Sequence, residues 1–172
     1  MARCSVCNQR TGYIDTGGFH GRFRSGEPLQ PFCPWCIANG KAAEKYDGYF
    51  NYFSFLALEE SELPAHIKKI PEDQLDELVF RTPRYSSLQG TEWFIHCHSP
   101  CIFLGKTKWV AIRNNPDIFN DINNDGVWFN GRKSEEELDA GWLEYWLTNE
   151  ERVGYLFKCF HCGKYLLNVE YT

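Results

Sequence analysis

Eight cysteines form four close pairs, and they are the residues of this chain best suited to chemistry. In three pairs two residues separate the cysteines, and in the fourth three residues do. This spacing lets a tight turn aim both thiolates at one metal ion, about 2.3 Å from each sulfur. Because no cysteine is left over, the pattern predicts two Cys₄ zinc sites. The candidate ligands are Cys4, Cys7, Cys33, Cys36, Cys97, Cys101, Cys159 and Cys162.

The simplest arrangement joins pairs that are neighbours in the sequence. The first two pairs then hold one zinc ion, and the last two hold the other. The crossed arrangement has the same ligand spacings, so the sequence leaves both pairings open.

The pair Cys33 and Cys36, in the stretch CPWC, also resembles a thioredoxin-type redox motif. The preceding strand of a βαβ unit is missing, and a redox role leaves three companion pairs unexplained. A disulfide framework is the third reading. The opening MARCSVCNQR shows no secretion signal, which predicts a reducing compartment where disulfides are rare. Metal binding is the favoured interpretation.

Three histidines lie close enough in sequence to compete as ligands. His96 and His98 flank Cys97, and His161 lies between Cys159 and Cys162. Four thiolates fill a tetrahedral zinc site, so we expect the imidazoles to lie outside the coordination sphere. A hydrolytic zinc keeps an open position for water, and the chain carries no HExxH motif. We therefore expect structural zinc and no enzymatic activity.

The composition is that of a globular protein with an acidic balance. Of 172 residues, 43% are hydrophobic, and the formal charge is −5. Eight thiolates and two zinc ions make that charge −9, which disfavours phosphate backbones on average. Residues 1–46 carry six cations against three acids, so a local basic patch stays possible. The most apolar stretch, 49–58, is too short to span a membrane, and we expect a soluble cytoplasmic protein.

The elements next to the cysteines decide where the thiolates point. A helix is expected over 37–46, directly after CPWC, and a short helix over 90–96 that delivers Cys97. Residues 102–104 read as a buried strand. The closing segments 155–158 and 165–171 read as two strands joined by CFHCG, which is the pattern of a zinc-ribbon hairpin.

Two further helices are predicted away from the cysteines. Pro71 suits a first helical position, and the apolar spacing that follows predicts a helix ending at Thr82-Pro83. Ser134 and Glu137 form a capping-box pattern at the start of the second helix. Its expected apolar face is Leu138, Trp142, Tyr145 and Trp146.

These elements predict an α+β fold. We expect a single compact domain built around the two Cys₄ sites, with the C-terminal zinc-ribbon β-hairpin. Residues 1–46 form an N-terminal zinc-knuckle module, and 90–172 form a C-terminal zinc module with the hairpin.

The stretch DINNDG at 121–126 matches the first half of a calcium-binding loop. Arg132 stands where that loop needs a bidentate glutamate, and Pro116 argues against the flanking helix. We interpret the stretch as an Asx-rich turn.

Four segments of the chain form a recognisable series: RTGYIDTG after the first cysteine pair, FCPWCIANGKAAEKYDGYF, RTPRYSSLQGTEWFIHCHSPCIFLG and GYLFKCFHCGKYLLNVEY. These segments cover most of the chain. In their order and their cysteine pairs they resemble the CbrC family of small bacterial proteins. The resemblance implies a role in colicin tolerance or toxin immunity, with the eight cysteines as zinc ligands and no catalytic residues.

The leading functional hypothesis is a cytoplasmic immunity or tolerance protein that binds a bacterial toxin. A nuclease toxin needs a basic groove for its phosphate substrate, and an acidic partner can occupy that groove. The partner is expected to be a contact-dependent inhibition or colicin-type effector. The candidate contact residues are Glu59, Glu60, Glu62, Glu72, Asp73, Asp76, Glu77, Glu135, Glu136 and Asp139.

Two other hypotheses come from different functional classes. A zinc-ribbon nucleic-acid binder is supported by Arg22 and Arg24, which lie beside Phe19 and Phe23 in the basic N-terminal part. A zinc-dependent enzyme is disfavoured because both predicted sites are coordinatively closed.

Overall fold

The chain divides into two compact units, residues 1–86 and 87–172. The computed structural model describes residues 2–15, 17–22, 31–53, 61, 65, 67–87, 89–90, 93–125, 127–129, 132–133 and 140–171. The predicted modules 1–46 and 90–172 each fall inside one unit. Together the units show the mixed α+β composition that the sequence predicts. No helix in the described part of the chain is both long and apolar enough to cross a membrane.

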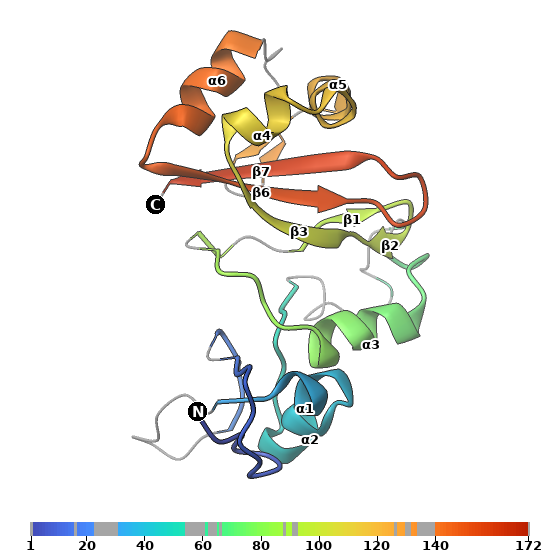
Figure 1. Ribbon diagram of the computed structural model, residues 1–172. Coiled ribbons are helices and arrows are strands. Elements are labelled where there is room, and N and C mark those ends of the chain that lie inside the picture. Colours follow the sequence, from blue (N-terminus) through green and yellow to red (C-terminus); the bar gives the residue numbers. More distant parts are fainter. Residues whose placement is uncertain are drawn as a thin grey trace. The chain divides into compact units, whose positions relative to one another are not determined.

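The described residues of unit 1 form three short α-helices and a few isolated backbone bridges (Figure 1). The helices are α1 (Pro34–Ala38), α2 (Lys41–Tyr46) and α3 (Glu72–Arg81). The single helix expected over 37–46 is two helices, because Gly40 takes a left-handed φ of 77° between them. The buried core of these segments is Phe19, Phe32, Ile37, Ala42 and Phe50.

Helix α3 confirms the helix predicted after Pro71. Leu78 and Val79 are buried, as the apolar spacing requires. The helix ends before Thr82, which takes an extended conformation ahead of Pro83, and the buried Asn51 side chain satisfies carbonyl groups at this end. The Asn51 Nδ2 group donates to the carbonyl oxygens of Leu78 and Thr82, both at 2.8 Å.

Unit 2 is built on a five-stranded sheet with the order β3-β6-β7-β4-β5. Only the β4–β7 pair is parallel among these neighbours. A separate two-stranded hairpin pairs β1 with β2. The strands are β1 (Ile95–His96), β2 (Ser99–Pro100), β3 (Ile102–Thr107), β4 (Val127–Phe129), β5 (Arg132–Lys133), β6 (Arg152–Lys158) and β7 (Tyr165–Tyr171).

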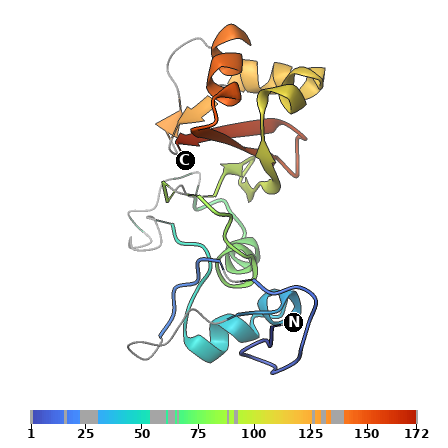
Figure 2. The ribbon, with the colours of Figure 1, turned by 60° about the vertical axis from the view of Figure 1, so that its left-hand side comes forward.

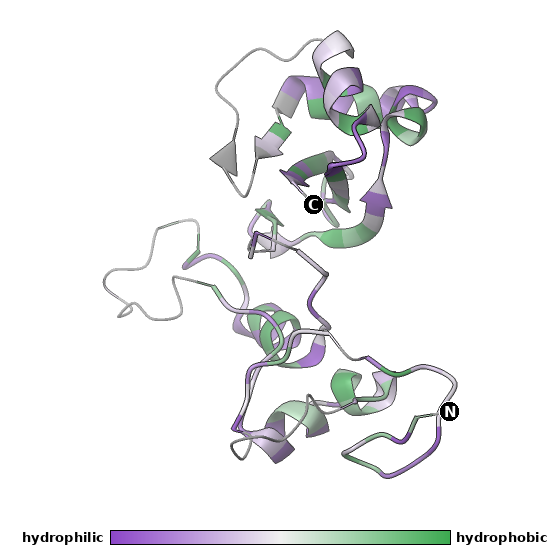
Figure 3. Cartoon of the chain, turned by 90° about the vertical axis from the view of Figure 1, so that its left-hand side faces the viewer, coloured by the Kyte–Doolittle hydropathy of each residue, from purple (hydrophilic) through white to green (hydrophobic). Residues whose placement is uncertain are grey.

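Three helices cover one face of this sheet (Figures 1 and 2). They are α4 (Trp109–Arg113), α5 (Pro116–Asp125) and α6 (Ala140–Thr148). Strands β6 and β7 supply the sheet side of the core. In Figure 3 the helices of this unit carry both hydrophobic (green) and hydrophilic (purple) residues. The buried cluster is Trp109, Ile112, Ile118, Ile122, Val127, Leu143, Leu147, Leu156, Leu167 and Val169.

Several predicted elements differ in unit 2. Residues 93–96 are not helical, and Ile95–His96 form strand β1 instead. Strand β3 exists, but it lies at the sheet edge, and Ile102 and Leu104 are 46% and 48% exposed rather than buried. An edge strand with one uncovered face alternates between exposed and sheltered side chains.

Residues 121–125 of the predicted Asx-rich turn form the second half of helix α5, which spans Pro116–Asp125, and Gly126 lies outside the described residues. Pro116 begins the helix instead of preventing it, because proline fits a first helical position. The Asn115 side-chain oxygen accepts the backbone N–H of Ile118 at 3.3 Å. Asp121 does not act as part of a turn, since its Oδ2 accepts the backbone N–H of Tyr165 at 3.0 Å.

The core face of helix α6 also differs from the prediction. Leu143 and Leu147 are the fully buried residues, whereas Tyr145 is 64% exposed. Trp142 and Trp146 are partly buried and stack on each other at 4.6 Å between ring centres. The predicted start at Ser134 and the residue Leu138 lie outside the described residues.

A buried arginine joins the end of α6 to the sheet. The Arg152 guanidinium lies 3.4 Å from the ring centre of Trp146, 4.9 Å from that of Tyr171 and 5.5 Å from that of Tyr145. Its Nη2 donates to the Tyr171 hydroxyl at 3.4 Å, while Nε and Nη1 are buried without a hydrogen-bond acceptor. The side chain is therefore held mainly by ring stacking.

Candidate metal centres

The first cysteine cluster begins with a tight turn at the N-terminus. The backbone N–H of Asn8 donates to the carbonyl oxygen of Cys4 at 2.8 Å, and the Cys4 N–H donates to the Gln9 carbonyl at 3.0 Å. Asn8 takes a left-handed φ of 60°, which asparagine tolerates better than most residues. This turn brings Cys4 and Cys7 onto one side of the chain.

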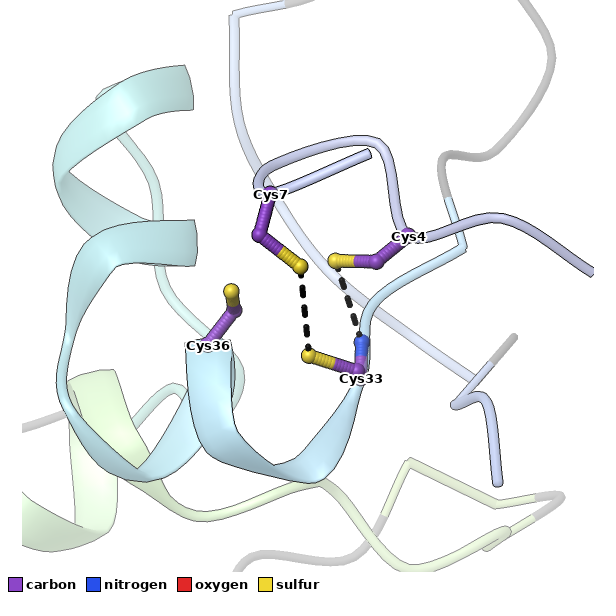
Figure 4. A group of neighbouring side chains, drawn as sticks. All are labelled: Cys4, Cys7, Cys33 and Cys36. Carbon is purple, nitrogen blue, oxygen red and sulfur yellow. Dashed lines mark hydrogen bonds between the residues drawn. The ribbon is translucent and has the colours of Figure 1, made fainter. Parts of the chain in front are cut away.

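The other half of this cluster is the start of helix α1. Cys33 is the N-cap residue, Pro34 takes the first helical position, and Cys36 follows in the first turn. The backbone N–H of Cys36 donates to the Cys33 carbonyl at 3.0 Å. One helical turn therefore places both sulfurs on the side that faces the N-terminal turn (Figure 4).

All four sulfurs of Cys4, Cys7, Cys33 and Cys36 lie within 4.8 Å of one another. The Cys7 and Cys33 sulfurs are 3.9 Å apart, and the Cys33 N–H points at the Cys4 sulfur at 3.3 Å (Figure 4). A tetrahedral zinc site with 2.3 Å bonds has sulfur–sulfur edges of about 3.8 Å. The cluster thus fits a metal ion such as zinc, and it joins the two neighbouring pairs rather than crossed ones.

The thiols of Cys4, Cys33 and Cys36 in the first cluster do not share one pKa. Burial raises the pKa of the Cys4 thiol, but the backbone N–H groups of Cys7, Cys33 and Val6 donate to its sulfur, so its pKa falls to about 6. Burial raises the pKa of Cys33 and also that of Cys36, where the nearby sulfurs of Cys33, Cys7 and Cys4 add to the rise. Cys4 is therefore the thiolate that is ready for a cation near neutral pH.

A second cluster lies in unit 2, at the turn of the β6–β7 hairpin. The Gly163 N–H donates to the Cys159 carbonyl at 3.1 Å, and the Cys159 N–H donates to the Lys164 carbonyl at 2.8 Å. This repeats the hydrogen bonds of the N-terminal turn. Gly163 takes a φ of 76°, the position that Asn8 fills in the first turn. Phe160, inside the turn, is 71% exposed.

The structure gathers His96, Cys97, Cys159 and Cys162 in this second cluster, with all ligand atoms within 4.8 Å. The His96 Nδ1 atom lies 3.3 Å from the Cys97 sulfur and 3.5 Å from the Cys162 sulfur. Cys101, predicted as the fourth ligand, is not one of these four residues. The sequence predicts that His96 lies outside the metal site. The structure instead places its imidazole among the four possible ligand groups.

The thiols of the second cluster also differ from one another in pKa. Burial raises the pKa of Cys159, but hydrogen bonds from the Cys162 backbone, the His96 side chain and the His161 backbone lower it to about 6. Burial, followed by the charges of Cys159, Cys162 and Cys97, raises the pKa of Cys101 to about 12. The hydrogen bond with the Cys162 side chain, followed by burial, raises the pKa of Cys97 to about 11.

The other two histidines are not in either cluster. His98 and His161 are exposed, although each lies next to a cluster cysteine in the sequence. The signal that distinguishes His96 is its place in strand β1, opposite Ser99, just before the turn that carries Cys97. Sequence spacing does not show that strand.

Comparison with known proteins shows the family. Residues 1–171 match the model described as "Uncharacterised protein family (UPF0167)". The chain belongs to the UPF0167 family. UPF0167 proteins of Mycobacterium bovis and Mycobacterium tuberculosis are each 28% identical to it over 98% of this chain and 82% of their own length. A UPF0167 protein of Pseudomonas aeruginosa is 25% identical over 98% of this chain and 86% of its own length.

No solved structure gave a significant match to this UPF0167 chain. The name CbrC does not appear in the family description or among these relatives, so that resemblance stays a prediction. The bacterial relatives agree with the expected bacterial family.

The predicted contact residues of the UPF0167 chain fall into two groups. Glu72, Asp73, Asp76 and Glu77 are exposed and lie along helix α3. The remaining six lie outside the described residues: Glu59, Glu60, Glu62, Glu135, Glu136 and Asp139.

Proposed function

We propose that this UPF0167 chain is a cytoplasmic immunity or tolerance protein that binds a bacterial nuclease toxin, with two structural zinc ions. The resemblance to the CbrC family gives the class of function, and the acidic side of α3 is the observation that supports it. A contact-dependent inhibition or colicin-type effector is the partner that this chemistry fits.

Helix α3 separates its acidic residues from its buried ones. At 100° per residue, Glu72, Asp73, Asp76 and Glu77 cover about 140° of the helix circumference. Leu75, Leu78 and Val79 cover the opposite side, where Leu78 and Val79 are buried. The acidic side therefore stays free of the core contacts and faces away from them. A basic nuclease groove is electrostatically complementary to such a surface.

Zinc has a structural role in this proposal. Each cluster offers four ligand atoms, which fill a tetrahedral coordination sphere and leave no open position for a substrate or a reactive water. Each metal ion would link chain segments that are distant in the sequence, such as Cys7 and Cys33, which are 26 residues apart. In this proposal the residues around the metal have no catalytic role.

The function is tested by survival of cells that make this protein together with the toxin encoded next to it. Protection, together with a complex in vitro, supports the proposal. If the protein is expressed at normal levels but neither protects the cells nor forms a complex with the toxin, the immunity proposal is wrong.

The contact surface is tested with the double variant Asp76→Asn/Glu77→Gln. We expect it to slow toxin association at least about tenfold at low salt, because rim charges steer encounter. The matched control is Glu44→Gln/Glu144→Gln, which removes two exposed acids from α2 and α6. If both double variants slow toxin association equally, net charge alone explains the effect and α3 is not the contact surface.

The alternative is a zinc-ribbon nucleic-acid binder. The structure removes part of its support, because Phe19 is buried and Arg22 forms an ion pair with Asp47 at 2.9 Å. Phe23 and Arg24 lie outside the described residues.

One observation still favours nucleic-acid binding. Arg3 and Arg10 are exposed bridge partners in the N-terminal turn region, and Trp35, between Cys33 and Cys36, is 63% exposed. Exposed aromatic rings suit stacked bases, and exposed cations suit phosphate groups. Binding of single-stranded DNA or RNA that weakens steeply with salt, and that Trp35→Ala abolishes, would support this function. Absence of binding at 50 mM salt would reject it.

A further inference from the structure

We propose that the second metal site of this chain is a Cys₃His site in which His96 Nδ1 is the fourth ligand, and that Cys101 stays nearby as a buried thiol without metal. The inference rests on the proposed structural metals and specifies the ligands of one of them. It also makes the two sites of the chain chemically different.

The distances fit a nitrogen ligand at this position. A tetrahedral zinc with bonds of about 2.3 Å to sulfur and about 2.1 Å to nitrogen has sulfur–nitrogen edges of about 3.6 Å. The His96 Nδ1 atom is 3.3 Å from the Cys97 sulfur and 3.5 Å from the Cys162 sulfur. Two of the three sulfur–nitrogen edges therefore match a tetrahedral site, and the Cys159 sulfur also lies within 4.8 Å of Nδ1.

The backbone around His96 holds it there. His96 pairs with Ser99 in the β1–β2 hairpin, and the two residues between them form the turn. Both turn residues have left-handed φ angles, 51° for Cys97 and 57° for His98. Two-residue hairpin turns with two positive φ angles favour Asn-Gly, and other L residues cost about 1 kcal/mol or more each there. A ligand that binds both His96 and Cys97 would offset that cost.

Cys101 has a different environment. It follows strand β2 and is 3% exposed, whereas Cys97 and Cys162 are exposed. Its backbone N–H donates to the Phe94 carbonyl at 2.9 Å, and its carbonyl accepts the Trp93 Nε1–H at 2.6 Å. These two bonds fix the Cys101 backbone against residues 93–94. A buried free cysteine packs as a small apolar side chain, which is the role left for this thiol.

The ligand set makes the two sites distinguishable by spectroscopy. Zinc with four thiolates carries a net charge of −2, while zinc with three thiolates and a neutral imidazole carries −1. Replacing sulfur by nitrogen changes the ¹¹³Cd chemical shift and moves the d–d bands of Co²⁺ to shorter wavelength.

The direct test loads the whole chain with ¹¹³Cd²⁺ and correlates the metal with protons of its ligands. We expect two cadmium resonances. One should couple to the Cβ protons of four cysteines, and the other to those of Cys97, Cys159 and Cys162 and to the His96 imidazole. Coupling of the second cadmium to the Cβ protons of Cys101, without coupling to His96, would overturn the inference.

Variants give an independent readout. His96→Asn should weaken Cd²⁺ or Zn²⁺ at the second site at least about a hundredfold, a larger loss than a second-sphere change typically causes. The first site serves as the internal reference. Cys101→Ala and His98→Asn should both retain two metals with unchanged second-site spectra. Loss of the second metal from Cys101→Ala but not from His96→Asn would contradict this assignment.

The two proposals fail in different ways. A wild-type chain that binds no second metal would refute the two-site proposal, and this inference with it. A chain that binds two metals, with Cys101 as a ligand of the second, would refute only the ligand assignment.

Discussion

The backbone N–H of Gly163 donates to the carbonyl oxygen of Cys159 at 3.1 Å, and Asn8 makes the same hydrogen bond to Cys4 at 2.8 Å. Gly163 and Asn8 each follow the second cysteine of a pair, and each has a positive φ angle. The first cysteine of each pair also has a thiol pKa lowered to about 6. The two units thus use one type of turn to present a thiolate.

Gly163→Ala should weaken the second turn. A φ of 76° is strained for alanine, by about 1 kcal/mol, so the free energy of unfolding of unit 2 should fall by about that amount. Denaturant titration of the metal-loaded protein measures it. Gly12→Ala, in unit 1, is the control for a glycine without strain: an added Cβ there meets nothing within 4 Å, so the stability of unit 1 should not fall. Equal losses in both variants would argue against a strained turn at residue 163.

Loss of a ligand should act inside one unit. Cys7→Ser should remove one metal and destabilise unit 1, whereas Cys162→Ser should remove the other metal and destabilise unit 2, because each cluster lies within a single unit. A structural zinc can contribute about 10 kcal/mol, which is comparable to the stability of a whole domain. Elemental analysis gives the stoichiometry, and hydrogen exchange locates the loosened residues. If amide hydrogen exchange becomes faster equally in residues 1–86 and 87–172 in both variants, the prediction that each metal stabilises one unit is wrong.

Metal affinity should fall as the pH is lowered from 8 to 6. Cys4 and Cys159 are largely thiolates at neutral pH, because their pKa values are about 6. Cys36 and Cys97 have raised pKa values, so these two thiols stay protonated in the metal-free chain. Metal must displace these protons, so the apparent affinity should change about tenfold per pH unit for each proton displaced. Co²⁺ titrations at several pH values and proton release in weak buffer measure this. An affinity independent of pH would count against thiol ligands.

Arg152→Lys should destabilise unit 2 although it keeps the positive charge. An ammonium group loses the flat stacking on Trp146 and Tyr171, and we expect a cost of about 1 to 2 kcal/mol. Thermal or denaturant unfolding measures it. Arg113→Lys, at an exposed position of α4, is the control and should change the stability by less than about 0.5 kcal/mol.

The sequence predicts the metal-binding turns better than the elements around them. A CxxC pair followed by glycine or asparagine is a local signal, so the turns at Cys4 and Cys159 follow from neighbouring residues alone. The β6–β7 hairpin follows from the two apolar runs beside Cys159 and Cys162. The joining of neighbouring pairs in the first cluster needed the structure, since spacing does not measure distance between segments.

The second cluster shows what ligand spacing does not measure. Cys97 and Cys101 have acceptable ligand spacing, but strand β2 lies between them, and Cys101 is buried and is not among the four residues whose ligand atoms lie within 4.8 Å of one another. At helix α5 the predicted element is wrong. DINNDG reads as a turn from its Asx content, yet Asn115, Pro116 and burial of Ile122 commit the segment to a helix. The capping by Asn115 and Pro116 is local, whereas the burial of Ile122 and the gathering of His96 with Cys159 depend on tertiary contacts.

Stacked rings, rather than opposite charges, hold Arg152 at the end of α6. Dissolved ions screen exposed charges beyond about 8 Å at physiological ionic strength, but they have little effect on a buried planar contact. Added sodium chloride should therefore leave this junction intact while it weakens the attraction of the α3 carboxylates for the proposed cationic partner. Ionic strength can then separate loss of recognition from loss of folded structure in a single titration.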